Sequence, residues 1–244
     1  ALATAAARNV VPCVLELGGK SAAIVHDDAD LDAFETDIRW GIYFNAGQVC
    51  SAMSRVIVHE SRAAEMLERA ERVARSLSVG PGIDRPETGP TMGAIVSDAQ
   101  RDRAVGMIAR AEEQGARVVT GGRKLNRPGA FLEPTVLSSV TADMEIAQQE
   151  VFGPVLSVLS FRDEAEAIEI ANGTEYGLVA GVFTADLDRA TRAARQLRAG
   201  QVFVNEWFAG GVETPFGGYG KSGYGREKGR EALWNYVQTK NVAL

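Results

Sequence analysis

The chain has 244 residues, of which 45% are hydrophobic and 24% charged, a composition typical of a globular protein with a sizeable core. Its formal charge of −6 disfavours a nucleic-acid backbone as a partner. No apolar run approaches the roughly 20 residues needed to cross a bilayer, so a membrane partner is not expected either.

Cysteine and histidine are both rare in this sequence. The cysteines are Cys13 and Cys50, and the histidines are His26 and His59. Two cysteines are too few for a disulfide framework, and no secretory signal is recognisable at the start, so a reducing, cytoplasmic location is expected. Without a Cys/His cluster, no metal site is predicted.

The chain opens with ALATAAARN and has no initiator methionine, which is typical of the end of a longer helix. Strand-like apolar runs follow at 12–17, 21–26, 54–59, 117–120, 131–138, 155–161, 179–184 and 201–205. Helical segments, several with an N-cap residue at their start, alternate with them at 30–44, 61–79, 97–115, 163–173, 186–199 and 226–236. The alternation predicts an α/β fold with a parallel sheet and helices on both faces.

The C-terminal part of the chain has a different character. Residues 210–225 are rich in glycine and predict a long loop, in which interleaved aromatic residues suit the wall of a pocket. Residues 236–244 alternate like an edge strand, which predicts pairing outside their own domain.

Cys50 is the first candidate for chemistry. It follows the polar and glycine-containing run NAGQV, which argues against a packed core position, although a lone cysteine is more often structural. A thiol attacks as thiolate, which requires help from its surroundings at neutral pH. From these residues alone, both interpretations stay open.

Two glutamates are further candidates. Glu16 ends an apolar run before Gly18-Gly19, where desolvation would raise its pKa and suit it as a general base, or it is a surface glutamate paired with Lys20. Glu150 and Phe152 point to the same side if their segment is extended. A carboxylate beside a ring could hold a ribose, or the pair could simply enter a strand.

Taken together, four blocks in this order resemble the aldehyde dehydrogenase superfamily over essentially the whole chain. They are LELGGKSAAIV at 15–25, FNAGQVCSA at 44–52, QEVFGPVLSV at 149–158 and ETPFGGYGKSGYGRE at 213–227. The resemblance implies that 1–19 are the tail of a coenzyme-binding domain, 20–225 a catalytic domain, and 226–244 a C-terminal helix and oligomerisation strand.

The resemblance also implies roles for individual residues in aldehyde oxidation with NAD or NADP. Cys50 would attack the aldehyde, Glu16 would activate the water that hydrolyses the resulting thioester, and Glu227 would lie on the proton exit route. Glu150 would hold the nicotinamide ribose, with Phe152 and Leu17 as further coenzyme contacts. The backbone N–H of Cys50 would supply half of the oxyanion hole.

The chain departs from the family in one respect. It contains no glycine-rich dinucleotide fingerprint and no segment for the second oxyanion donor, an asparagine side chain in the family. The N-terminal coenzyme-binding half is therefore expected as a partner, and these 244 residues alone are expected to lack dehydrogenase turnover. In the family the C-terminal segment crosses to another subunit, which implies a homodimer or tetramer.

Substrate residues are implied only by position. Those that match the family's substrate tunnel are Trp40, Phe44, Val49, Ser51, Phe208 and Phe216. Gly210, where several relatives carry a bulky aromatic residue, suggests a wider mouth. The rings suit an aromatic or medium-chain apolar aldehyde, and also an amino-aldehyde, because aromatic faces accommodate cations.

Two alternatives remain from the sequence. A cysteine hydrolase would need a histidine to activate Cys50, and neither His26 nor His59 lies in a motif. A non-catalytic piece would keep the motifs by descent and serve only structure or oligomerisation.

Overall fold

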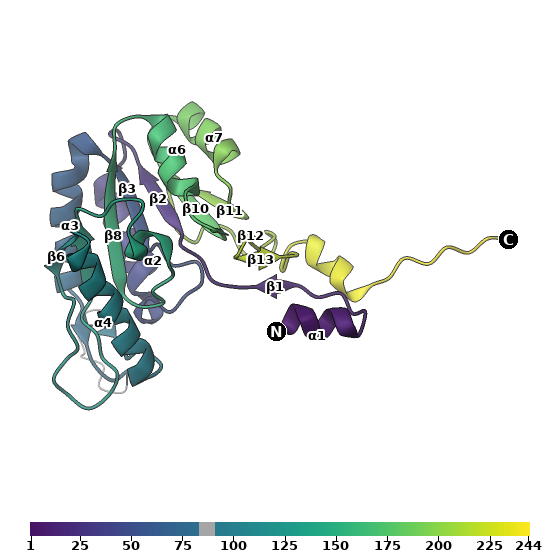
Figure 1. The fold of residues 1–244 in the computed structure, drawn as a ribbon. Coiled ribbons are helices and arrows are strands. Elements are labelled where there is room, and N and C mark those ends of the chain that lie inside the picture. The colour runs from purple at the N-terminus through teal and green to yellow at the C-terminus, as the bar shows by residue number, and fades with distance from the viewer. Residues whose placement is uncertain (83–90) are drawn as a thin grey trace.

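The computed structural model describes residues 1–82 and 91–244, and its centre is a sheet of seven strands (Figure 1). Across the sheet the order is β11 (Gln201–Val204), β10 (Val179–Phe183), β2 (Ala22–Val25), β3 (Arg55–His59), β8 (Val155–Phe161), β7 (Thr135–Ser138) and β6 (Arg117–Thr120). All neighbours are parallel except β6, which pairs antiparallel with β7 at the edge. The predicted α/β class is confirmed, with a mixed, mostly parallel sheet.

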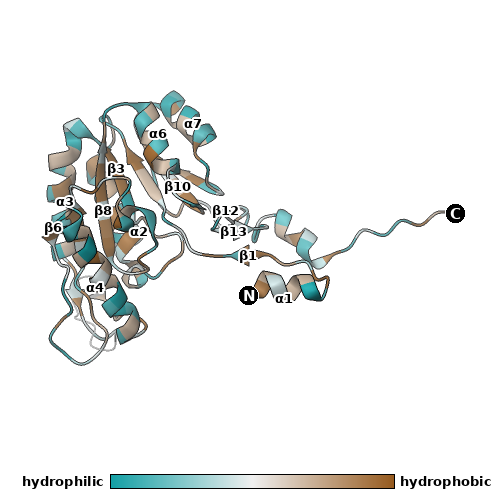
Figure 2. Cartoon of the chain, in the orientation of Figure 1, coloured by the Kyte–Doolittle hydropathy of each residue, from teal (hydrophilic) through white to brown (hydrophobic). Residues whose placement is uncertain are grey.

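Helices cover both faces of this sheet. On one face lie α2 (Leu31–Tyr43) and α3 (Ala63–Arg75), on the other α6 (Glu164–Asn172) and α7 (Leu187–Gln196), while α4 (Asp98–Glu113) packs beside β6. Successive side chains of β2 point to opposite faces of the sheet. Ala22 and Ile24 pack with α6 and α7, and Ala23 and Val25 pack with α2. Figure 2 shows these strands in brown between helices that carry teal outer faces.

The helix starts follow the predicted capping chemistry. The Asp30, Asp163 and Asp186 side chains each accept a hydrogen bond from a backbone N–H of the first turn, which satisfies donors that a helix leaves unpaired. Ser97 caps α4 in the same way, by accepting from the N–H of Gln100. The Gln100 side chain does not form the reciprocal hydrogen bond of a capping box with the Ser97 backbone. It donates instead to the carbonyls of Val151 and Phe152, at 2.8 and 3.0 Å.

Shorter elements complete the described chain. They are α1 (Leu2–Arg8), β1 (Leu15–Glu16), η1 (Phe44–Gly47), η2 (Glu60–Arg62), β4 (Ser78–Val79), β5 (Thr91–Met92), α5 (Glu145–Gln148), β9 (Tyr176–Gly177), β12 (Tyr219–Gly220), β13 (Gly223–Tyr224) and η3 (Glu231–Tyr236). In the described part of the chain, no helix has the length and apolarity that a membrane crossing requires.

Both ends of the chain differ from the sequence-based expectation. The strand expected at 12–17 shrinks to β1, which leaves the main sheet and pairs with β13. The helix expected at 226–236 is only the short 3-10 helix η3, and residues 237–244 form no strand within this chain. Figure 1 shows this C-terminal segment running away from the body of the molecule, where no strand of the same chain can pair with it.

Candidate active site

The candidate residues gather at the amino-terminal edge of the parallel sheet. The Gly18-Gly19 turn leads into β2, the Cys50 loop leads into β3, and the Glu150 segment leads into β8. Because β2, β3 and β8 are consecutive parallel neighbours, their starts share one edge. Three motifs that are far apart in the sequence therefore meet in space.

The loop that carries Cys50 has an unusual backbone. Asn45, Ala46 and Gly47 all have positive φ angles, of 51°, 55° and 72°, a conformation that costs energy in residues other than glycine. The Asn45 and Gln48 side chains each donate to the other residue's carbonyl at 3.0 Å and hold the turn closed. The position of Cys50 is therefore set by local hydrogen bonds within its own loop.

Gly47 joins this loop to the segment that follows Glu150. A Cβ atom at Gly47 would lie 2.1 Å from the Gly153 carbonyl oxygen, so an alanine would both strain φ and push the two loops apart. We expect Gly47→Ala to lower the free energy of unfolding by about 2 kcal/mol, as measured by urea denaturation. Gly93→Ala is the matched control, because a Cβ there meets nothing within 4 Å. Equal effects of both changes would contradict this account.

Glu150 reaches the turn before β2. The N–H of Gly19 donates to Glu150 Oε1 at 3.1 Å, and a Cβ at Gly18 would lie 2.1 Å from Oε2. Arg103 donates to the carbonyls of Glu150 and Val151 and fixes the backbone of this segment. The absence of a side chain at Gly18 is what lets the carboxylate occupy this place.

The sequence-based pairing of Glu150 with Phe152 assumed an extended backbone. The structure shows that this segment is not extended throughout. Phe152 has a φ of +55°, a left-handed conformation. The carbonyl of Phe152 accepts the Gln100 amide, which helps to hold this strained backbone. The expectation that Glu150 and Phe152 point the same way because of an extended backbone is therefore wrong at Phe152.

Glu16 is held in a dry environment. Both of its carboxylate oxygens are shielded from solvent and accept no hydrogen bond from the described residues, and a Cβ at Gly217 would lie 3.0 Å from Oε1. Burial raises the pKa of Glu16 and the charge of Glu227 raises it further, against a smaller opposing effect of Arg226. The alternative of a surface glutamate paired with Lys20 is wrong.

The thiol of Cys50 lies within the electrostatic reach of both glutamates. Burial is the main cause that raises its pKa, and the charges of Glu16 and Glu150 add to it. Hydrogen bonds from the backbone N–H groups of Ser51 and of Cys50 itself favour the thiolate but do not outweigh burial. The three side chains therefore form one electrostatic unit.

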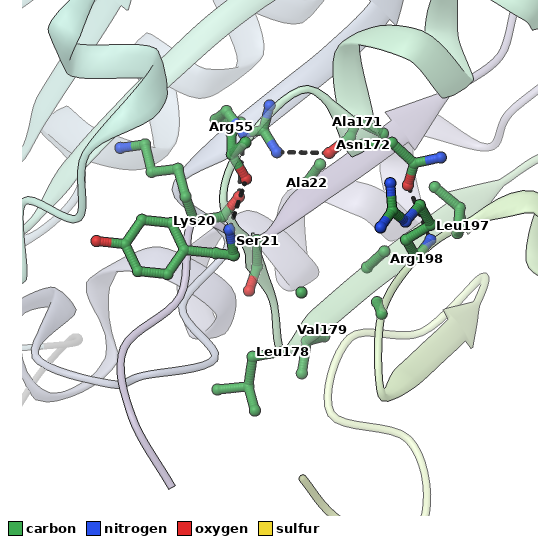
Figure 3. Close-up of a pocket in the computed structure, with 15 residues that line it drawn as sticks. Lys20, Ser21, Ala22, Arg55, Ala171, Asn172, Leu178, Val179, Leu197 and Arg198 are labelled. Atoms are coloured by element: carbon green, nitrogen blue, oxygen red, sulfur yellow. Dashed lines mark hydrogen bonds between the residues drawn. The ribbon is translucent and has the colours of Figure 1, made fainter. Parts of the chain in front are cut away.

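A buried arginine anchors the turn that carries Glu16 and Gly19 (Figure 3). Arg55, only 1% exposed, donates from Nε to the Lys20 carbonyl at 3.0 Å, and from its two terminal nitrogens to Ile170 and Ala171 at 2.7 and 2.8 Å. The last two acceptors belong to the C-terminal end of α6, where a cation is favourable. Arg55 thus connects the starts of β2 and β3 to α6, which lies on the sheet face opposite α2 and α3.

Lys20 is a residue whose importance the sequence did not indicate. It is 2% exposed and its Nζ has no hydrogen-bond partner among the described residues. Burial, with a further effect of the nearby Arg55, lowers its pKa to about 7, while Glu150 opposes this shift. The only signal in the sequence was its place directly after two glycines.

Four of the six expected substrate residues line one cavity of about 550 Å³. The described residues that line it are Thr36, Asp37, Trp40, Phe44, Val49, Glu206, Trp207 and Phe208. Val49 directly precedes Cys50 in the sequence, so the cavity adjoins the loop that carries the thiol. Asp37 and Trp40 are three residues apart on α2 and Phe44 directly follows the helix, a pattern that could have been found in the sequence, whereas Trp207 could not.

The remaining expected residues lie outside this cavity. Ser51 is buried, and Phe216 exchanges backbone hydrogen bonds of 2.7 Å with Glu227, with the Lys228 ammonium over its ring. Leu17 is 44% exposed, and its N–H donates to Ser222 at 3.1 Å. The charge of Glu227 acts on Glu16, so the structure places Glu227 near Glu16.

The histidines lie at the other edge of the sheet. His26 follows β2 and His59 ends β3, so both are at the carboxyl ends of strands whose amino ends adjoin Cys50. Both rings stand edge-on to Phe161, with centroids 5.4 Å away. Within residues 1–82 and 91–244, no group of three His, Cys, Asp or Glu side chains is arranged to hold a metal ion.

Comparisons with known proteins identify the family of this chain. Residues 1–242 match the sequence profile described as the aldehyde dehydrogenase family. A mitochondrial aldehyde dehydrogenase of Leishmania tarentolae is 44% identical over 98% of this chain and 47% of its own length. A betaine aldehyde dehydrogenase of Cereibacter sphaeroides is 45% identical over 98% of this chain and 49% of its own.

The fold comparison gives the same result. The NAD+ complex of an aldehyde dehydrogenase from Bacillus cereus superposes with a TM-score of 0.92 at 39% identity, over 97% of this chain and 48% of that one. The chain thus spans about half the length of the relatives it matches. Sequence profile, identity and fold all place it in the aldehyde dehydrogenase family.

Proposed function

We propose that this chain supplies the nucleophile, the general base and the ribose clamp for NAD(P)-dependent oxidation of an aldehyde to a carboxylic acid. The observation that carries the proposal is the meeting of Cys50, Glu16 and Glu150 at one strand edge, where each glutamate influences the thiol. Such a cluster of perturbed groups beside a cavity is typical of an active site.

In the first half of the reaction, the Cys50 thiolate adds to the aldehyde carbonyl. The resulting oxyanion would be stabilised by the N–H of Cys50, a donor already in place before reaction. When bound, the oxidised nicotinamide accepts the two electrons and the hydrogen of the aldehyde carbon, and its positive charge favours the thiolate. The acyl group then remains on Cys50 as a thioester.

In the second half, Glu16 takes a proton from the water that attacks this thioester. Its dry surroundings and raised pKa are what a general base near neutral pH needs. Glu227, whose charge contributes to the raised pKa of Glu16, is the group through which that proton could leave. The products are the carboxylic acid and the free thiol.

The residues present fit a nicotinamide ribose. Glu150 Oε1 is fixed by the N–H of Gly19, and the missing Cβ of Gly18 gives the carboxylate room beside the turn; its remaining lone pairs can accept two hydroxyl groups. Coenzyme binding and the second oxyanion donor require a coenzyme-binding half, so we propose dehydrogenase turnover only for the assembled protein, in a homodimer or tetramer. The choice between NAD and NADP would be made in that half.

The test is whether an aldehyde protects Cys50. We expect hexanal to slow alkylation of Cys50 by iodoacetamide, because the reversible thiohemiacetal occupies the thiol, and to leave Cys13 unaffected. We also expect Glu150→Gln to speed Cys50 alkylation at neutral pH several-fold, since loss of a nearby negative charge lowers the pKa of the thiol. Peptide mass spectrometry measures both cysteines in one sample.

Other outcomes separate the alternatives. Equal protection of Cys13 and Cys50, or of neither, would support the catalytically incomplete piece that serves only structure or oligomerisation. If His26→Ala or His59→Ala abolished the reactivity of Cys50, a cysteine hydrolase would be favoured. We expect both histidine variants to leave it unchanged.

A further inference from the structure

The cavity beside Cys50 has two carboxylates in its wall that have no ion-pair partner among the described residues. Asp37 and Glu206 both line it. Other acidic residues of the same helix are paired: Asp32 and Glu35 both bind Arg69. Neither Asp37 nor Glu206 takes part in any such pair in the described part of the chain.

The two carboxylates also repel each other. Asp37 Oδ1 already accepts the N–H of Trp207 at 2.7 Å, which fixes the carboxylate in the wall. Burial raises the pKa of Asp37 and the charge of Glu206 raises it further. Among the described residues that line the cavity there is no lysine or arginine to offset the two carboxylates.

The rest of the lining is suited to a cation of low hydration. Trp40 and Phe44 lie 6.3 Å apart, are 55% and 53% exposed, and so offer open ring faces. Phe208 is partly exposed as well. Aromatic faces attract ammonium groups, and the attraction is greatest for quaternary ammonium, which is weakly solvated.

The loop that supplies Glu206 is held rigidly. Asn205 and Phe208 have positive φ angles of 56° and 67°, and the Asn205 side-chain amide exchanges two hydrogen bonds of 2.9 Å with the Thr184 backbone. The Trp207 ring fits over Gly181, where a Cβ would lie 2.8 Å from the ring. Strained residues persist when the surroundings impose them, and they are concentrated at functional sites.

We propose that this cavity selects aldehydes that carry a positive charge, either quaternary ammonium or protonated amine, with Asp37 and Glu206 as the specificity-determining residues. The inference rests on the proposed function only in taking the cavity as the aldehyde's entrance. Asp37 lies in the middle of α2, about 10 Å along the helix from Phe44, which follows the helix and leads into the Cys50 loop. The charge therefore binds at the far end of the substrate from the reacting carbon.

The test uses two unreactive alcohols of the same shape on the whole chain. Choline has a positively charged quaternary nitrogen where 3,3-dimethylbutan-1-ol has a neutral quaternary carbon. Binding is measured by the fluorescence of Trp40 and Trp207, in a Trp234→Phe background that removes the remaining tryptophan. With sodium chloride matching the ionic strength, we expect choline to bind about ten-fold more tightly, as a desolvated cation–π contact beside carboxylates predicts.

The variants assign this preference to the two carboxylates. Asp37→Asn and Glu206→Gln should each reduce it about three-fold, and together abolish it, while binding of the neutral alcohol stays the same. Asparagine at position 37 can still accept the Trp207 N–H. Glu213→Gln is the control: it removes one charge from an exposed residue of the adjoining loop that does not line the cavity, and it should leave the preference intact.

Equal affinities for the two alcohols would overturn the proposal, as would a preference that survives the double variant or falls equally in Glu213→Gln. The outcome is independent of the thiol, because choline does not react with Cys50. If choline is preferred but aldehydes do not protect Cys50, the proposed function fails and the cation site stands. If aldehydes protect Cys50 and choline is not preferred, only the present inference fails.

Discussion

Glu16→Gln is expected to leave acyl transfer to Cys50 intact and to stop the step that follows. With p-nitrophenyl acetate, the Cys50 thiolate attacks the ester carbonyl, nitrophenolate leaves, and an acetyl thioester remains, so no coenzyme is needed. Water must then hydrolyse the thioester, and we propose Glu16, whose carboxylate oxygens are shielded from solvent, as the group that activates this water. Loss of a general base reduces a rate by about 100-fold or more.

The measurement is a burst of nitrophenolate followed by steady turnover. In the Glu16→Gln variant we expect the burst to remain, the steady phase to collapse, and mass spectrometry to find acetylated Cys50. Its acylation at neutral pH should be faster, because removal of the Glu16 charge lowers the pKa of the thiol. Cys50→Ala should lose the burst itself, and Cys13→Ala should lose nothing.

Two outcomes would contradict this assignment of roles. A burst that persists in Cys50→Ala would show that another nucleophile reacts. A steady rate that is unchanged by Glu16→Gln would remove Glu16 as the base, and Glu227→Gln would then be the next variant to measure, since Glu227 is the carboxylate that acts on Glu16.

Lys20→Met is expected to stabilise the fold at neutral pH and to flatten its dependence on pH. The pKa of buried Lys20 falls from 10.5 to about 7, so the unfolded chain binds a proton more tightly than the folded one. Wild-type stability should therefore rise with pH above about 7, by up to about 1.4 kcal/mol per pH unit. Near pH 7 the penalty that methionine removes is on the order of 4 kcal/mol.

Urea unfolding between pH 7 and pH 8.5 measures this effect before cysteine ionisation in the unfolded chain adds an opposite slope. Lys221→Met is the matched control, because Lys221 is an exposed lysine paired with Glu175 and should contribute little. A wild-type stability that is flat or falls over this range, or a Lys20→Met variant that is less stable than wild type, would mean that the Lys20 ammonium is stabilised in the fold.

The local features of the fold were predictable because their causes are local. Asp30 and Asp186 begin helices since a side-chain oxygen satisfies the first turn, and Gly115, with its φ of +108°, ends one. Element types followed from periodicity. The limits of the strand near Leu15 could not be predicted from periodicity, because β1 forms by pairing with β13, more than 200 residues away.

The site shows the same division. Cys50, Glu16 and Glu150 could be named from their motifs, but their surroundings depend on contacts that no short segment contains. Lys20 is buried because Arg55, 35 residues later, holds its carbonyl. The left-handed backbone at Phe152 is supported by a hydrogen bond from Gln100, 52 residues earlier in the chain. Burial and strain of this kind arise only after the whole sheet has assembled.

The two parts of the site rest on different supports. Cys50 and Glu150 lie in loops that lead into core strands, and Glu16 ends β1 just before the turn into β2; Arg55 and the glycine contacts hold these segments in place. The cavity wall is formed by the outer face of α2 and by the loop after β11, where most side chains contribute little to the core. Exchanges at Glu206, or at Asp37 to a residue that still accepts the Trp207 N–H, can therefore accumulate without loss of folding, so this architecture can evolve, or be engineered, toward new substrates while the thiol and the glutamates stay in place.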